Sequence, residues 1–183
     1  EHIGIPDKLY FDNGVEIKNS SKDIIENSDL LLKVGCPNND EINLIKKNLI
    51  LVGIFNPSNN ETKLKELLKK ETKIFSLELL PRITRAQSMD VLSSQSNLAG
   101  YRAVIDSVAE FEKAVPMMMT AAGTVPAAKV LVIGAGVAGL QAIATAKRIG
   151  AIVSATDVRA ASKEQVESLG GKFLTVEQSE DME

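Results

Sequence analysis

The feature that most constrains this chain is the stretch over residues 128–157, AKVLVIGAGVAGLQAIATAKRIGAIVSATD. It contains a continuous apolar run over Val130–Ile133, which is typical of a parallel strand buried on both faces. A Gly-x-Gly-x-x-Gly turn follows, and the apolar stripe over Val137–Ile149 predicts a helix after it. A second strand is predicted over Ala151–Thr156, with Asp157 at its end. Strand, turn, helix, strand and acid in this order predict a βαβ unit that binds a dinucleotide.

Each glycine of the turn has a separate physical task in that motif. Gly134 makes the tight turn, Gly136 lets a pyrophosphate approach the backbone, and Gly139 allows the helix to pack closely on the strand. The predicted helix points its unpaired N–H groups and the positive end of its dipole at the phosphates. Asp157 lies where a carboxylate would accept hydrogen bonds from the adenosine ribose hydroxyls. The plainer alternative is a glycine-rich turn in an ordinary βαβ unit.

The residues after the second strand bear on which dinucleotide is bound. Asp157 favours NAD over NADP, because a 2′-phosphate beside a carboxylate would meet like-charge repulsion. Arg159 leaves an alternative open, since an arginine at this position accommodates a 2′-phosphate in some enzymes. It also fits a solvated arginine at the start of a helix.

Composition excludes several classes of function. The net charge is −3 over 183 residues, so there is no basic surface of the kind that binds nucleic acid. No stretch of eighteen or more apolar residues predicts a transmembrane helix, and the first residues do not resemble a signal peptide. Cys36 and His2 are the only residues of their types, so neither an intramolecular disulfide nor a zinc site is expected. We expect Cys36 to be an inert thiol and Met117–Met119 to pack in the interior.

The first eighty residues alternate strand-like and helix-like segments. This alternation predicts a parallel α/β sheet. The predicted strands cover residues 29–35, 49–55 and 74–80, and the predicted helices cover residues 20–27, 41–48 (capped by Asp40) and 62–70.

The middle of the chain predicts a connection between two lobes. Pro81 ends the first lobe, a polar stretch follows over residues 82–97, and a long helix is predicted from about residue 98. We therefore divide the chain into a partial α/β lobe (1–80), a loop with a connecting helix (81–127) and a partial dinucleotide-binding lobe (128–183).

The second lobe continues past Asp157 with a predicted helix over Ser162–Leu169 and a strand over Lys172–Thr175. That supplies roughly half of a six-stranded dinucleotide fold. The first lobe likewise begins without its expected opening strand. The fold class is therefore α/β, with two doubly wound, Rossmann-like lobes, both incomplete. We expect an interior piece of a longer protein.

The segment LELLPRITRAQSMDVLSSQSNLAGYRAVIDS, residues 77–107, closely resembles the NAD(H)-binding component of proton-translocating nicotinamide nucleotide transhydrogenase. The resemblance continues through PMMMTAAGTVPAAKVLVIGAGVAGLQAIATAKRIGA and TDVRAASKEQVESLGGKFLTV. It covers residues 74–176 strongly and the first seventy more loosely. It implies two doubly wound lobes, a homodimer when complete, and direct hydride transfer from NAD(H) to NADP(H) held by a partner component. It also implies a membrane component that conducts protons, with this component peripheral to the inner membrane on its cytoplasmic or matrix side.

The resemblance also implies which residues bind the cofactor. It assigns the nicotinamide end to a polar loop and its neighbour, where Arg82, Gln87 and Asp90 would position the hydride and Ser93 would assist. The remaining cofactor-binding residues that we expect are Gly134, Ala135, Gly136, Val137, Gly139, Asp157, Val158 and Arg159.

These residue types suit hydride transfer between two nicotinamides, which has no substrate proton to abstract. The protein holds the two rings in near-attack geometry and excludes water. Gln87 offers a donor and an acceptor that match a carboxamide, while Arg82 has the geometry to pair with a phosphate or with Asp90. The simpler interpretation makes Asp90 and Ser93 helix caps and Arg82 and Arg85 surface charges.

Several residues keep structural assignments or none. Arg102 and Asp106 have the i, i+4 spacing of a helical ion pair, whereas Arg85 and Tyr101 have no assigned role. An alanine dehydrogenase-like amino-acid oxidoreductase, which shares the two-lobe architecture, is the alternative enzyme. An inactive split-gene fragment is the alternative without activity.

Overall fold

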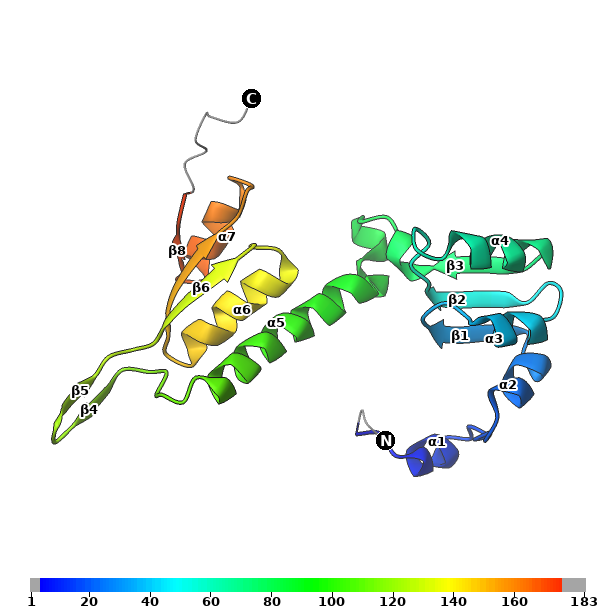
Figure 1. The fold of residues 1–183 in the computed structure, drawn as a ribbon, viewed down its shortest axis with the longest axis horizontal. Coiled ribbons are helices and arrows are strands. Elements are labelled where there is room, and N and C mark those ends of the chain that lie inside the picture. Colours follow the sequence, from blue (N-terminus) through cyan, green and yellow to red (C-terminus); the bar gives the residue numbers. More distant parts are fainter. Residues whose placement is uncertain (1–3, 176–183) are drawn as a thin grey trace. The chain divides into compact units, whose positions relative to one another are not determined.

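The computed structural model describes residues 4–175, which divide between Asp90 and Val91 into two compact units (Figure 1). In each unit the chain alternates strands and helices, and each unit contains a three-stranded parallel sheet. The expected Rossmann-like α/β fold class is therefore confirmed. Among the described residues, no helix combines the length and the apolarity that crossing a bilayer requires.

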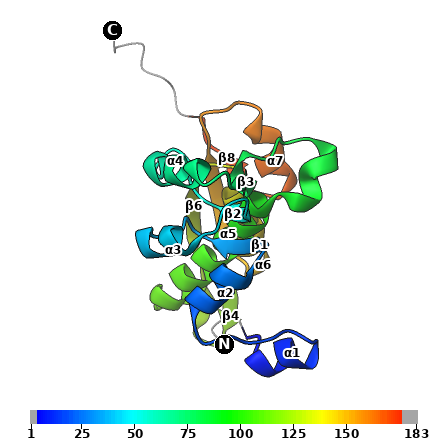
Figure 2. The same ribbon diagram turned by 90° about the vertical axis from the view of Figure 1, so that its right-hand side faces the viewer.

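The sheet of the first unit has the order β1 (Leu30–Val34), β2 (Ile50–Ile54) and β3 (Lys73–Ser76). The helices around it are α1 (Asp7–Asp12), α2 (Ser21–Asn27), α3 (Asn39–Leu44) and α4 (Glu61–Lys69). Because parallel crossovers are right-handed, α3 and α4 lie on the same side of the sheet (Figure 2). Their apolar residues pack against alternate strand residues in one core that includes Ile42, Leu51, Phe55 and Leu67.

The second unit begins with the long helix α5 (Val91–Glu110) and the hairpin β4 (Met118–Thr120) and β5 (Gly123–Val125). The parallel sheet then runs β6 (Lys129–Ile133), β7 (Ile152–Thr156) and β8 (Lys172–Phe173), connected by α6 (Val137–Arg148) and α7 (Ser162–Ser168). Helix α5 packs on α6 at close range. A Cβ added at Gly100 would lie 2.0 Å from the Ala138 carbonyl oxygen, so only glycine allows this approach.

The predicted strand–turn–helix–strand motif is confirmed within one or two residues at each boundary. Ile143, Ala146, Val153, Ala155 and Val166 form the core between this sheet and its helices. The 3.6-residue and two-residue periodicities that predicted these elements are the ones that bury their apolar faces.

Three local predictions were wrong, each because a contact distant in sequence prevailed. The third strand ends at Ser76 instead of Leu80, and a 3₁₀ turn over Leu77–Leu79 replaces its last residues. Helix α3 is capped by Asn38 instead of Asp40. It ends at Leu44 because the Lys70 ammonium donates to carbonyl oxygens at its C-terminus, among them that of Ile45 at 3.0 Å.

The segments on both sides of the long helix also differ from expectation. The helix begins at Val91, so the polar stretch after residue 90 is helical. The stretch with three methionines forms the β4–β5 hairpin, and Met117, Met118 and Met119 are exposed instead of packed. Thr120 stabilises the hairpin turn, because its hydroxyl donates to the Gly123 carbonyl oxygen at 2.9 Å.

Candidate functional site

The glycine turn lies between the end of β6 and the start of α6. Gly134 has a φ of +94°, a conformation that glycine adopts without strain, and its N–H donates to the Thr156 carbonyl oxygen at 2.8 Å. This bond fixes the turn to the end of the neighbouring strand β7. Both segments therefore meet at the carboxyl edge of the parallel sheet, where ligands of such folds bind.

The other two glycines divide the roles of the motif as expected from their spacing. A Cβ added at Gly139 would lie 1.8 Å from the Gly134 carbonyl oxygen, which the packing forbids. A Cβ added at Gly136 would meet no atom within 4 Å. The space beside Gly136 is therefore open to a ligand, whereas the space beside Gly139 is filled by the turn itself. The backbone geometry fits a pyrophosphate at this turn.

The N-terminus of α6 is directed at the same open space. Gly136 is the N-cap residue and no side chain caps this end of the twelve-residue helix. The first N–H groups of a helix have no acceptor within the helix, and they carry the positive end of its dipole. Val137, the first helical residue, is exposed and Ala135 is buried beneath the turn.

The carboxylate of Asp157 closes the turn from the end of β7. One of its oxygens accepts from the Ala135 N–H at 2.7 Å, and the other accepts from the Arg159 N–H at 2.8 Å. The Arg159 guanidinium also binds both oxygens, with Nε at 3.0 Å and Nη2 at 3.1 Å. These hydrogen bonds, those from Arg159 above all, hold the pKa of the Asp157 carboxyl far below its usual value.

Arg159 is thus neither a free surface charge nor a free ligand for a 2′-phosphate. Its side chain is 62% exposed whereas that of Asp157 is 6% exposed, so the guanidinium covers the carboxylate from the solvent side. A ribose that binds Asp157 has to share the carboxylate with this guanidinium or displace it. Val158, between the two, is fully exposed.

The predicted nicotinamide loop lies at the end of the first unit. Arg82 and Gln87 are exposed, and Gln87 belongs to a 3₁₀ helix over Thr84–Met89 that buries Ala86. Asp90 and Ser93 are half-buried on either side of the start of α5. The roles that the resemblance assigns to these four residues stay predictions.

One acidic residue that the sequence interpretation missed is Glu78. The apolar pattern predicts it inside a strand, whereas it lies in the 3₁₀ turn that follows β3. One carboxylate oxygen accepts from the Ser76 hydroxyl at 2.8 Å, and the other accepts from the Asn56 N–H at the end of β2. An acid next to a predicted strand end, four residues before Arg82, was the signal available in the sequence.

The remaining polar candidates behave as structural groups. The Arg102 guanidinium binds Asp106 at 2.7 Å on α5, which confirms the predicted i, i+4 pair. Burial raises the pKa of the Cys36 thiol, so this thiol is less reactive than an ordinary cysteine. Among residues 4–175 no group of three or more His, Cys, Asp or Glu side chains is placed to hold a metal ion.

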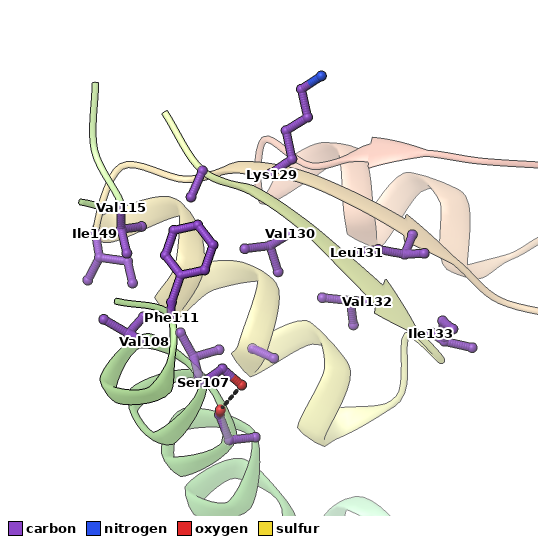
Figure 3. Close-up of a pocket in the computed structure, with 14 residues that line it drawn as sticks. Ser107, Val108, Phe111, Val115, Lys129, Val130, Leu131, Val132, Ile133 and Ile149 are labelled. Carbon is purple, nitrogen blue, oxygen red and sulfur yellow. Dashed lines mark hydrogen bonds between the residues drawn. The ribbon is translucent and has the colours of Figure 1, made fainter. Parts of the chain in front are cut away.

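An apolar groove of about 420 Å³ lies between α5 and β6 (Figure 3). Its walls include Val104, Val108 and Phe111 from the helix and Val130 and Val132 from the strand. The Ser107 hydroxyl is occupied by the Ala103 carbonyl oxygen at 2.7 Å, and the figure shows the Lys129 ammonium directed away from the other side chains. This lining lacks the polar groups that recognise a nucleotide.

Comparison with family models gives two matches. Residues 1–99 match the N-terminal domain of alanine dehydrogenase/PNT, and residues 103–183 match the C-terminal domain of alanine dehydrogenase/PNT. Together the two matches cover nearly the whole chain.

Individual relatives point to one branch of that family. The chain is 57% identical over 169 residues to the first part of NAD(P) transhydrogenase subunit alpha of Rhodospirillum rubrum, covering 90% of this chain and 44% of the relative. The crystal structure of transhydrogenase from Sinorhizobium meliloti superimposes with a TM-score of 0.88 at 54% identity, covering 96% of this chain and 50% of that one. Alanine dehydrogenase of Methanococcus maripaludis is 26% identical, over 93% of this chain and 46% of the relative. The chain thus spans about half the length of the relatives it matches.

Proposed function

Because the chain belongs to the alanine dehydrogenase/PNT family, we propose that it forms the NAD(H)-binding part of a proton-translocating transhydrogenase. In this proposal hydride passes between NAD(H) on this chain and NADP(H) on a partner component. The much higher identity to a transhydrogenase subunit than to an alanine dehydrogenase favours this branch of the family.

The observation that carries the proposal is the contact between the Asp157 carboxylate and the Ala135 N–H of the glycine turn, at 2.7 Å. It joins the two halves of a dinucleotide site, the phosphate turn and the ribose acid, at one edge of the sheet. The open space at Gly136 supports the same conclusion, because a pyrophosphate needs that approach to the backbone.

In this site the residues of the chain bind and orient the cofactor. Gly134, Ala135, Gly136 and Val137 hold the pyrophosphate, with Gly139 fixing the helix behind them, and Asp157 holds the adenosine ribose beside Val158 and Arg159. NAD(H) supplies the hydride chemistry when bound. Arg82, Gln87, Asp90 and Ser93 orient the nicotinamide end, and no side chain has to transfer a proton.

The partners in this proposal are an NADP(H)-binding component, a membrane component that conducts protons and a second copy of the complete subunit. The chain would be held at the cytoplasmic or matrix face of the inner membrane through those components. The name of the Rhodospirillum relative describes it as one of several numbered parts of subunit alpha, which supports a division of the enzyme among several chains.

The first test is calorimetric titration of the full chain with NADH and with NADPH, together with Asp157→Asn. We expect NADH to bind selectively. We expect the variant to lose roughly 10-fold or more in NADH affinity, because hydrogen bonds to a charged group contribute about 1.5–3 kcal/mol.

Asp106→Asn, which removes a carboxylate paired with an arginine on α5, is the matched control and should bind NADH like the unmodified chain. Equal affinity for the two dinucleotides, or an equal loss in the control, would contradict the proposed site. Alanine-dependent reduction of NAD by the full-length protein would favour the alanine dehydrogenase alternative.

A further inference from the structure

The carboxyl ends of β2 and β3 carry a connected group of polar side chains that the cofactor assignment does not use. Glu78 lies at its centre and holds the ends of both strands with its two carboxylate oxygens. One oxygen accepts from the Asn56 N–H, two residues after the end of β2. The other accepts from the hydroxyl of Ser76, the last residue of β3, at 2.8 Å.

The far side of this group is anchored in the core. The Asn60 amide donates to the carbonyl oxygens of Phe55 at 2.9 Å and Asn56 at 3.3 Å. Asn56 has a φ of +47°, so its N–H is directed by a left-handed turn that asparagine tolerates better than most residues. The Phe55 side chain is completely buried. Glu78 is therefore bound to a rigid part of the sheet.

The segment that follows Glu78 is a succession of short hydrogen-bonded turns. The Leu80 N–H donates to the Leu77 carbonyl oxygen at 3.2 Å, and the Ile83 N–H donates to that of Pro81 at 2.9 Å. The Asp90 N–H closes the series on the Gln87 carbonyl oxygen at 3.2 Å. Because each turn starts from the previous one, the orientation of the whole segment depends on where its first turn is held.

From this geometry we infer that Glu78 is a positioning residue for the loop over residues 82–90, which carries Arg82, Gln87 and Asp90. The inference rests on the proposed function, in which that loop orients the nicotinamide. Glu78 touches neither cofactor nor substrate in this account. It holds the loop against the ends of β2 and β3 so that Gln87 meets the carboxamide in a productive orientation.

The ionisation of Glu78 agrees with this role. Burial alone would raise the pKa of its carboxyl, but hydrogen bonds from its own N–H, from Ser76 and from the Asn56 and Phe55 N–H groups outweigh burial and lower it. A carboxylate accepts at both oxygens, whereas a glutamine in its place presents an NH₂ group to one of the two donors.

The experiment compares Glu78→Gln with Glu66→Gln, an exposed glutamate on α4, in the assembled transhydrogenase. Hydrogen exchange measures the order of the loop and of β1–β3, and steady-state kinetics measure kcat and the KM for NADH. We expect faster exchange over residues 79–90 with unchanged exchange in the strands. We expect a kcat lower by about tenfold with little change in KM, because small misplacements of reacting groups slow transfer strongly.

Ser76→Ala removes one of the two donors and guards against a Glu78 variant that does not fold. It should move exchange and kcat in the same direction by a smaller amount. Unchanged loop exchange in Glu78→Gln, or a looser loop with an unchanged kcat, would overturn the inference. Exchange that rises equally in the strands would assign Glu78 to general stability instead. An unmodified complex that transfers no hydride between NADH and NADP would contradict the proposed function itself.

Discussion

At the scale of single residues, Asp157 connects three parts of the second unit. Its carboxylate binds the Ala135 N–H of the glycine turn and both the backbone and the guanidinium of Arg159. Because these bonds lower the pKa of the carboxyl, Asp157 stays ionised at any pH near neutrality. A ribose hydroxyl therefore meets an acceptor that does not depend on pH in that range.

Gln87 is the residue whose role kinetics can separate from binding. In the intact complex, Gln87→Ala should slow hydride transfer by about 10- to 100-fold while weakening NADH binding much less, because an orienting contact acts mainly on the reactive geometry. Stopped-flow transfer rates and equilibrium titration of NADH give the two numbers. Ser88→Ala, an exposed neighbour in the same 3₁₀ helix, is the control. Equal losses of rate and affinity in Gln87→Ala would refute its assignment as a positioning group.

At the scale of elements, the turn and helix α6 form the rigid part of the candidate site. Gly134 supplies the left-handed turn, and Gly139 brings the first turn of the helix against it. The twelve-residue helix is held from behind by α5, which approaches it closely at Gly100. The position of the helix N-terminus is therefore decided by packing on two sides.

Two alanine substitutions in this element should have opposite consequences. Gly139→Ala should lower the free energy of unfolding by about 1–3 kcal/mol, because its methyl group would overlap the Gly134 carbonyl oxygen. Gly136→Ala should leave stability nearly unchanged, since its φ is −80° and the space is open, but it should weaken NADH binding. Denaturant unfolding and NADH titration of both variants test this. A stable Gly139→Ala, or Gly136→Ala with unchanged NADH affinity, would contradict the division of roles.

At the scale of the whole molecule, each unit leaves apolar strand residues uncovered. Leu32 and Val34 on β1, and Leu131 and Ile133 on β6, are all more than half exposed. Helices cover one face of each sheet, whereas a doubly wound fold has helices on both. The relatives are about twice as long as this chain, so they contain further segments that this chain lacks.

The uncovered strand residues should make the 183-residue chain bind apolar dyes and self-associate. The double variant Leu131→Thr/Ile133→Thr keeps strand-forming residues and should reduce both dye fluorescence and the sedimentation-derived mass. Val158→Thr is the control, because Val158 is fully exposed as a single residue outside the sheet. An equal reduction by the control, or none by the double variant, would show that these strand residues do not drive association.

The sequence by itself determined the elements whose pattern is local. The glycine spacing, the helical stripe over α6 and the short apolar runs of β6 and β7 act within a few residues of one another, so they predicted type and limits closely. The same holds for the order of strands and helices in the first unit, because parallel connections follow a fixed handedness. The positions of the predicted site residues along these elements followed directly.

Only the tertiary structure decided which polar groups meet. Asp157 reaches Ala135 across the sheet edge, Glu78 reaches Asn56, and Lys70 ends α3 from a distant helix; none of these contacts has a periodic signal. The exposed methionine hairpin was missed for a related reason, since composition alone favours burial of methionine. Hydrogen bonds between residues far apart in sequence depend on the completed fold, because only its packing brings donor and acceptor together.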